Sequence, residues 1–440
     1  AAMRVPWWVP PLALGASFTP GCQRYGVCTG IGRADWNQFT AQYDQAVSLQ
    51  NFGRVDEAFN ILHNLMETYA KDPFVMYECK MGAGAVFYRL GKIYSQAGHF
   101  QRAHNLHQLA MSMLWDTSRE GELGLQCIEA ELWGMNWSEF MTDYLTLAYQ
   151  LRRHEEDGLP PVNSVPPSHK FNAKIAVVSL CDYAPDHKLH GIDKLSIANR
   201  EPYTRLHGYE NVFHTGRVSG RHPVWDALYI PYKMLHERPD LDWIMWLDCD
   251  AMFVDMSVTI ESMIARFASL PNGELDPNVH FIISEDGRGL SGGNWIVRNT
   301  EWARSFLKSV LGPDDESQNP YMHHDLRDQF SLLWHLVRPG ASAAAPGEPA
   351  ARAPTQPQAW EWLEYIPQVR LIAQRWLNAY PWALCRPSHH CFEDGQDFIV
   401  SFITLGSLSR TMAFSMLHKF LNQSLQSVGQ ALPQPLVDIA

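Results

Sequence analysis

The stretch Trp-Ile-Met-Trp-Leu-Asp-Cys-Asp-Ala-Met-Phe, residues 243–253, decides the fold. Its apolar run, residues 243–247, predicts a buried strand. The strand ends in Asp248 and Asp250, which we expect at the carboxyl edge of a sheet, where open α/β folds bind ligands. Neighbouring carboxylates repel each other, and Mg²⁺ or Mn²⁺, which prefer oxygen ligands, would relieve that repulsion. The stretch therefore predicts a metal site. The alternative is a strand followed by an Asp-rich turn.

Composition limits the classes of function. With 440 residues, the chain has room for one or two domains, and its 46% hydrophobic content supplies a core. The formal net charge of −12 argues against a nucleic-acid partner, which would need a basic face. None of the 8 cysteines forms a Cys-x-x-Cys pair, which argues against a zinc ribbon. Cys22/Cys28 and Cys385/Cys391 are close enough in sequence for disulfides, which would fit a secretory compartment. The alternative is free buried thiols.

The first third of the chain divides into a tail, residues 1–33, and a helical domain, residues 34–153. The sequence has no stretch of 18 apolar residues, so it predicts no membrane span. Residues 5–16 are apolar but short, and we interpret them as the remnant of an anchor or signal. The helical part resembles a short tetratricopeptide-like set of hairpins, for partner binding or self-association. The alternative is a helical layer packed on the next domain. Residues at the repeat spacing are Phe87, Leu90, Gly91, Tyr94, Gly98, Ala103 and Ala110.

A Pro-rich segment, residues 154–170, predicts a semi-rigid linker. Because few contacts cross such a boundary, we expect the chain before it to be removable without unfolding the rest. From residue 171 to the end, apolar strand-like runs alternate with helical patterns. That alternation predicts an α/β domain with a mostly parallel sheet. Residues 338–358 are rich in Ala, Pro and Gly and predict a low-complexity insertion.

Several motifs occur in a fixed order in this second domain. Residues 196–209 read Ser-Ile-Ala-Asn-Arg-Glu-Pro-Tyr-Thr-Arg-Leu-His-Gly-Tyr, and Trp225 follows. Next come Trp-Leu-Asp-Cys-Asp-Ala-Met-Phe at 246–253, Gly-Asn-Trp-Ile-Val-Arg-Asn-Thr-Glu-Trp at 293–302, and Asp328-Gln329. Together, over residues 173–405, they resemble the galactosyl/xylosyl/mannosyltransferase family. That family includes plant xyloglucan xylosyltransferases, galactomannan galactosyltransferases and yeast mannan-building subunits.

The resemblance implies a GT-A fold, which is the Rossmann-like fold of nucleotide-diphospho-sugar transferases. It also implies a UDP-sugar donor, such as UDP-galactose or UDP-xylose, and Mn²⁺ (or Mg²⁺) at the Asp-x-Asp motif. The implied reaction is transfer of the sugar to a glycan acceptor with retention of the α configuration. The implied location is the Golgi lumen.

The same resemblance implies roles for individual residues. Asp248 and Asp250 would hold the cation, and Asp248 would also face the nucleotide. Asp328 or Gln329 would face the anomeric carbon as the catalytic group. Further residues expected at the donor are Ser179, Asn199, Tyr203, Gly292 and Gly293, with the two glycines leaving room for the sugar.

Two departures from the family pattern weaken the expected diphosphate binding. Ser401 stands where the family carries a histidine that binds the metal, and Asp226 stands where it carries a lysine after Trp225. If another residue supplies the missing ligand, we expect His389 or His390. The departures leave open a catalytically impaired scaffold or binding protein. A phosphohydrolase of the haloacid dehalogenase type is a further alternative, but strands precede the motif and Phe253 follows it, where that class has Thr or Val.

Overall fold

The computed structural model describes residues 33–69, 80–119, 137–156, 173–270, 272–286, 289–314, 318–319, 321, 326–337, 368–385, 390–403 and 405–431. The expected linker after residue 156, the insertion at 338–358, Cys22, Cys28 and His389 lie outside these residues.

A six-stranded sheet forms the centre of the molecule, with strand order β2-β1-β3-β6-β5-β7. The β1–β2, β1–β3 and β5–β7 pairs are parallel, and β6 runs antiparallel to both of its neighbours. The predicted α/β class and mostly parallel sheet are therefore confirmed. The strands are β1 (Ile175–Leu180), β2 (Glu210–His214), β3 (Trp243–Leu247), β5 (Phe281–Asp286), β6 (Gly289–Arg298) and β7 (Val369–Ile372).

Alternate residues of each strand face opposite sides of the sheet, because side chains in a strand repeat with a period of two. On β3, Ile244 and Trp246 join one hydrophobic core, and Trp243 and Met245 join another. All five residues of β3 are buried. This two-sided burial explains why the run is apolar throughout rather than alternating.

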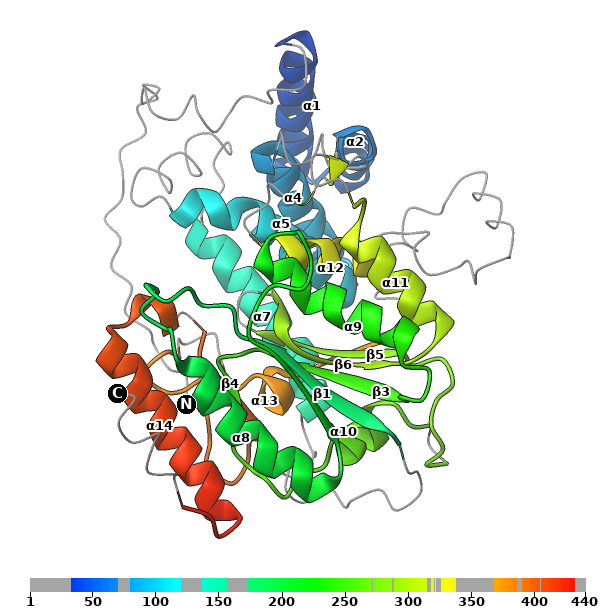
Figure 1. Ribbon diagram of the computed structural model, residues 1–440. Coiled ribbons are helices and arrows are strands. Elements are labelled where there is room, and N and C mark those ends of the chain that lie inside the picture. Colours follow the sequence, from blue (N-terminus) through cyan, green and yellow to red (C-terminus); the bar gives the residue numbers. More distant parts are fainter. Residues whose placement is uncertain are drawn as a thin grey trace, which may run out of the picture.

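Two groups of helices cover the two faces (Figure 1). On one side lie α9 (Asp226–Glu237), α11 (Glu301–Leu311) and α12 (Arg327–Val337). On the other side lie α8 (Ile192–His207), α10 (Ile260–Phe267) and the short α13 (Gln374–Leu377). A third core joins α8 to α14 (Arg410–Ser427) and to a small antiparallel sheet of β4 (Ala251–Phe253) and β8 (Ile399–Ser401).

The described residues of the N-terminal part form helices: α1 (Arg33–Asn51), α2 (Val55–Tyr69), α4 (Lys80–Gln96), α5 (Phe100–Arg119) and α7 (Trp137–Glu156). Helices α4 and α5 form a hairpin that turns at Gly98, whose φ of +81° favours glycine. A Cβ atom at Gly91 would lie 2.4 Å from the His107 ring, so glycine allows the close contact of the two helices. The tetratricopeptide likeness itself stays a prediction.

These helices lie on the same side of the sheet as α9, α11 and α12 (Figure 1). One continuous hydrophobic core extends from Phe39 in α1 to Trp334 in α12 and Trp295 in β6. Helix α5 contacts both β6 and α12. The contacts favour the packed-layer alternative and weigh against the expectation that residues 1–153 are removable. In the part of the chain that the structure describes, no helix is both long and apolar enough to cross a bilayer.

Candidate active site

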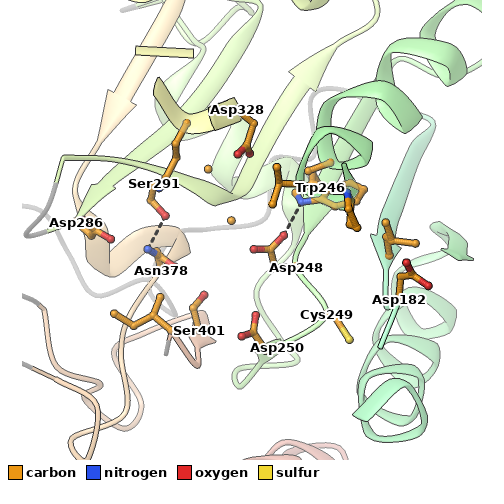
Figure 2. A pocket seen from close by; sticks show the side chains of 18 of the residues that line it. Asp182, Trp246, Asp248, Cys249, Asp250, Asp286, Ser291, Asp328, Asn378 and Ser401 are labelled. Atoms are coloured by element: carbon orange, nitrogen blue, oxygen red, sulfur yellow. Dashed lines mark hydrogen bonds between the residues drawn. The ribbon is translucent and has the colours of Figure 1, made fainter. Parts of the chain in front are cut away.

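A pocket of about 490 Å³ opens where β1 and β3 end and the loops after β5 and β8 meet them. This is the expected position, the carboxyl edge of parallel strands. Its volume is within the usual range for small-molecule sites. Figure 2 shows the carboxylates of Asp248, Asp250 and Asp328 directed toward one common space. The pocket is lined by Leu180, Asp182, Tyr183, Pro223, Val224, Ala227, Trp246, Asp248, Cys249, Asp250, Asp286, Ser291, Gly292, Gly293, Asp328, Gln329, Asn378, Tyr380, Ser401 and Ile403.

Asp248 is held on several sides. The Trp246 indole donates a hydrogen bond of 2.8 Å to Asp248 Oδ1. The backbone N–H of Asp248 donates to the Gly293 carbonyl at 3.0 Å and to Asn294 Oδ1 at 3.2 Å. Because β3 ends at Leu247, these bonds fix the first turn of chain beyond the sheet and aim one carboxylate oxygen into the pocket.

Asp250 is fixed from the opposite strand. Its carbonyl accepts a hydrogen bond of 2.8 Å from the Phe402 N–H. The next residue, Ala251, pairs with Ser401 across the β4–β8 ladder. Ser401 therefore lies beside Asp250 and lines the pocket, with its hydroxyl accepting from Asn294 Nδ2 at 2.6 Å.

Asp328 and Gln329 enter the pocket from the first turn of α12. Gln329 Nε2 donates to the Leu290 carbonyl at 2.9 Å, which ties the helix to β6. Asp286, at the end of β5, accepts a hydrogen bond from the Tyr380 hydroxyl. The structure thus brings Asp328 and Gln329 to the same cavity as Asp248 and Asp250, although 78 or more residues separate them in sequence.

Glycine is required at positions 292 and 293 of β6 because neighbouring side chains lie close to the backbone there. A Cβ atom at position 293 would lie 2.9 Å from Asp248 Oδ2, and one at position 292 would lie 3.0 Å from Gln329 Cγ. Any larger residue would displace those side chains. The glycines therefore leave space for the neighbouring side chains of Asp248 and Gln329. That they also leave room for the sugar stays a prediction.

The electrostatics of the pocket are acidic. Five aspartates line it, and the described lining residues include no Lys, Arg or His. Burial raises the pKa of Asp250 to about 6 and that of Asp328 to about 7. Burial, together with the charges of Asp250 and Asp328, raises the pKa of Asp248 well above its usual value. A cavity with this charge repels an anionic ligand unless a cation accompanies the ligand.

Comparison with known proteins decides the family. Residues 172–404, more than half of the chain, match the galactosyl transferase GMA12/MNN10 family. The chain belongs to this family. The matched region contains the whole central sheet and both aspartates of the Asp-x-Asp motif.

Individual relatives are distant. An alpha-1,2-galactosyltransferase of Schizosaccharomyces pombe is 27% identical over 33% of this chain and 47% of its own length. A probable alpha-1,6-mannosyltransferase of Saccharomyces cerevisiae is 23% identical over 48% of this chain and 54% of its own. Xyloglucan 6-xylosyltransferase 2 of Arabidopsis thaliana is 26% identical over 30% of each. The chain thus spans about a third to half of the length of these relatives. A solved glycosyltransferase, involved in glycosylation of the major capsid of PBCV-1, aligns with 56% of this chain and 99% of its own at TM-score 0.38 and 15% identity.

Three residues expected at the donor in this family member lie elsewhere. Ser179 donates to the Leu247 carbonyl at 2.7 Å, and Asn199 Nδ2 donates to the Phe253 carbonyl at 2.9 Å. Tyr203 donates to the Val258 carbonyl at 2.8 Å. All three are fully buried and none lines the pocket. We correct the expectation accordingly: their polar groups join strands and loops, because buried polar atoms must find partners.

Asp226, one of the two departures from the family pattern, and His390, a suggested replacement ligand, both bond away from the pocket. Asp226 does not line the pocket; its carboxylate accepts from the N–H groups of Val218 and Ser219 at 3.1 and 2.9 Å. His390 does not line the pocket, and its Nε2 lies 2.9 Å from both oxygens of the buried Asp397. The described geometry gives no support to His390 as a replacement ligand.

Sequence reasoning missed several pocket residues. Asp286, Asn378 and Tyr380 line the cavity, but they follow ordinary strand and turn patterns. It also missed the disulfide between Cys181 and Cys249, which lie 68 residues apart. The predicted Cys385–Cys391 disulfide is present. In the structure, Cys181 directly follows β1 and Cys249 lies just after β3, so the two cysteines meet at the ends of neighbouring strands.

Proposed function

We propose that this chain is a metal-dependent glycosyltransferase with a GT-A fold. It transfers a hexose or pentose from UDP-galactose or UDP-xylose to a glycan acceptor, with retention of configuration. The observation that carries the proposal is the pocket of five aspartates and no basic side chain among its described lining residues, at the strand edge of a member of this family. The names of the galactosyl-, mannosyl- and xylosyltransferase relatives support the reaction class.

The donor atoms at the site fit a divalent cation. Asp248 and Asp250 offer hard carboxylate oxygens, which Mg²⁺ and Mn²⁺ prefer. Among the described residues, no three His, Cys, Asp or Glu side chains cluster closely enough to hold a metal by themselves. A cation would therefore be held by the two aspartates, with diphosphate and water completing its coordination, as is usual for Mg²⁺. When bound, it would supply Lewis-acid neutralisation of the leaving diphosphate.

The chain's own residues would position the donor. Trp246 keeps one oxygen of Asp248 occupied, so the other is available in the pocket. Asp328, at the start of α12, would face the anomeric carbon and stabilise positive charge that develops there. Gln329 is anchored to Leu290 and would fix the helix end that carries Asp328. Electrostatic stabilisation of this kind usually contributes more to the rate of an enzyme than any other single effect.

The disulfides support a location in the secretory pathway. Cys181–Cys249 and Cys385–Cys391 are both formed, and disulfides persist in oxidising compartments. We therefore propose that the enzyme acts in the Golgi lumen.

A donor screen tests the proposal. UDP-galactose, UDP-xylose, UDP-glucose and GDP-mannose are each incubated with Mn²⁺ and a glycan acceptor, and nucleotide release is measured with and without chelator. We expect release from one UDP-sugar, with chelator abolishing it. The Asp250→Asn variant is the control for non-enzymatic hydrolysis. Release that chelator leaves unchanged contradicts the metal-dependent reaction.

Ser401 favours a second candidate, a catalytically impaired glycosyltransferase-like binding protein. It occupies the place of a histidine ligand and is already hydrogen-bonded to Asn294. This candidate predicts that UDP binds with Mn²⁺ but that no donor releases nucleotide. Calorimetry beside the donor screen separates the two functions.

A further inference from the structure

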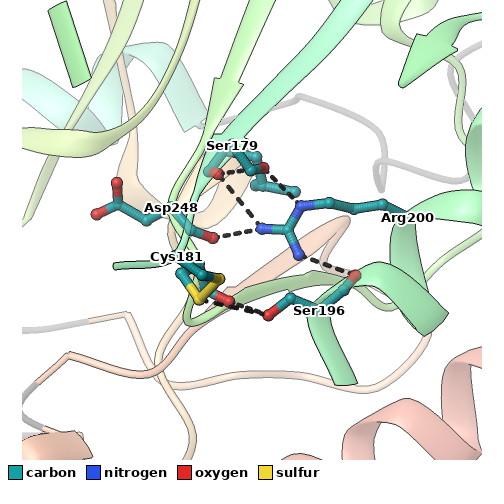
Figure 3. Close-up of a disulfide and its surroundings, with 7 residues drawn as sticks. Ser179, Cys181, Ser196, Arg200 and Asp248 are labelled. Atoms are coloured by element: carbon teal, nitrogen blue, oxygen red, sulfur yellow. Dashed lines mark hydrogen bonds between the residues drawn. A yellow bond between two sulfur atoms is a disulfide. The ribbon is translucent and has the colours of Figure 1, made fainter. Parts of the chain in front are cut away.

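The cysteine between the two aspartates is covalently bound. Cys249 forms a disulfide with Cys181, the residue directly after β1, with a Cα–Cα distance of 5.2 Å (Figure 3). Both cysteines are buried, and Cys249 lines the pocket. The bond therefore joins the ends of two neighbouring parallel strands, β1 and β3, at the wall of the cavity.

The triplet Asp248-Cys249-Asp250 is also held through all three of its carbonyl groups. Arg200 donates to the Asp248 carbonyl, and the Ser196 hydroxyl donates to the Cys249 carbonyl. The Phe402 N–H donates to the Asp250 carbonyl. Figure 3 shows the Asp248 carbonyl turned toward Arg200 and its carboxylate turned away. The backbone is thus held from α8 at Asp248 and Cys249 and from the residue after β8 at Asp250, and the carboxylates of both aspartates line the pocket.

None of these hydrogen bonds reaches a carboxylate oxygen, although the charge of Arg200 attracts both carboxylates. Arg200 is fully buried, and its hydrogen bonds go to Ser179 Oγ and to the carbonyls of Ser196, Leu247 and Asp248. Two aspartates one residue apart repel each other, and that repulsion favours a loop in which they separate. A covalent tie at the residue between them opposes this separation.

We propose that the Cys181–Cys249 disulfide is a positioning device for the reaction: it holds the triplet in the one backbone conformation that brings both carboxylates to the pocket. Without it, the protein keeps its fold and loses affinity for a divalent cation and UDP. The ligand in this statement rests on the proposed function. The fixed backbone conformation does not.

The chain contains a matched control. Cys385–Cys391 is a second disulfide, and neither of its cysteines lines the pocket. Each of two double variants, Cys181→Ser/Cys249→Ser and Cys385→Ser/Cys391→Ser, removes one disulfide and replaces its two sulfur atoms by hydroxyl groups. Near-ultraviolet circular dichroism and thermal melting identify a temperature at which both variants are folded, and every comparison is made below it.

Hydrogen exchange measures positioning without any ligand. We expect amides of residues 248–251 to exchange at least tenfold faster in Cys181→Ser/Cys249→Ser than in the parent, while those of α11 are unchanged. In Cys385→Ser/Cys391→Ser, residues 248–251 should exchange as in the parent. Unchanged exchange in the first variant, or equal acceleration in both, overturns the proposal.

Calorimetry with Mn²⁺ and UDP then measures the consequence. We expect the Kd for UDP with Mn²⁺ to rise at least tenfold in Cys181→Ser/Cys249→Ser and to stay within twofold in the control variant. An unchanged Kd in a variant with faster exchange overturns the link between positioning and binding. If the parent itself binds no UDP with Mn²⁺, the proposed function fails, and the exchange experiment alone decides whether the disulfide positions the triplet.

Discussion

Two walls of the pocket are built from different parts of the chain. The β3 wall, comprising Trp246, Asp248, Cys249 and Asp250, is held by bonds from Arg200, Ser196, Phe402 and Cys181, all within the family-matched region. The β5–α12 wall, comprising Asp286, Gly292, Asp328 and Gln329, lies on elements that α5 contacts from outside that region.

The contact between α5 and β5 is specific. Glu285, next to Asp286, is buried; its Oε2 lies 3.1 Å from His104 Nε2, and its Oε1 accepts from Gln108 at 2.7 Å. A buried carboxylate is costly unless it is hydrogen-bonded. The helical layer therefore stabilises the strand end that carries Asp286. The comparison teaches that the β3 wall is held within the family-matched region, whereas the opposite wall has bonds within that region and additional contacts from α5.

Deleting residues 1–156 should have the largest effect, because it exposes the core face that runs from α5 to α12 and leaves Glu285 without His104 and Gln108. We expect the truncated chain to lose its cooperative thermal transition. Differential scanning calorimetry measures this. A cooperative transition within a few degrees of the parent would restore the view of two independent domains.

The walls should differ next in their contribution to cation binding. Asp250→Asn removes a proposed ligand and should weaken UDP binding with Mn²⁺ by more than about 100-fold, since even substitutions beyond the ligands cost about 10–100-fold. Asp286→Asn, on the other wall, should weaken it by about tenfold, the lower end of the range for positions beyond the ligands. Calorimetry compares the two isosteric variants. Equal effects would mean that the walls share the cation.

The stability link between α5 and β5 can be tested with one residue. His104→Ala removes a partner of the buried Glu285 and should lower the free energy of unfolding by about 2 kcal/mol. The matched control is Arg54→Ala, which removes the exposed pair with Glu57 and should cost less than about 1 kcal/mol. Denaturant titration gives both values. If the two variants are equally stable, the claim that α5 stabilises the β5 wall through Glu285 is contradicted.

The raised pKa values predict that the pocket contributes to the pH dependence of stability. In the unfolded chain an aspartate titrates near 3.9, whereas Asp250 and Asp328 titrate at about 6 and about 7 in the folded protein. The folded state therefore binds more protons between pH 4 and 7, and stability without metal falls as pH rises through that range. With chelator, we expect Tm to decrease by several degrees from pH 5 to pH 7.5. With Mn²⁺, we expect Tm to increase over the same pH range. Asp250→Asn should flatten the first profile; an identical slope in that variant contradicts the assignment.

The smallest effect should come from Ser401→His. Ser401 pairs with Ala251 beside Asp250, so an imidazole there would reach the β3 wall. Imidazole is a stronger ligand for Mn²⁺ than a neutral hydroxyl, and we expect UDP affinity with Mn²⁺ to rise severalfold. If both Ser401→His and Asp250→Ala leave binding unchanged, the site holds no metal and the binding-protein function is favoured.

Local patterns were sufficient to predict much of the fold. The apolar run of β3 and the alternation of strands and helices both depend on near neighbours in sequence. The position of Asp248 and Asp250 at a strand end is equally local. So is the need for glycine at 292 and 293, which the motif indicated and the contacts with Gln329 and Asp248 explain.

Only the tertiary structure decided which distant groups meet. Nothing in the local pattern places β6 antiparallel between β3 and β5, pairs Cys181 with Cys249, or brings His104 to Glu285, 181 residues away. Sequence spacing favoured short disulfides such as Cys385–Cys391, yet the entropy of closing a loop grows only slowly with its length, so spacing discriminates weakly. Ser179, Asn199 and Tyr203 lie in motif-bearing segments, but the fold directs their polar groups to buried carbonyls. The sequence by itself determined the acidic strand end, because that depends on a few consecutive residues. The tertiary structure decided the opposite wall and the bonds that hold both walls, because those depend on packing between segments far apart in the chain.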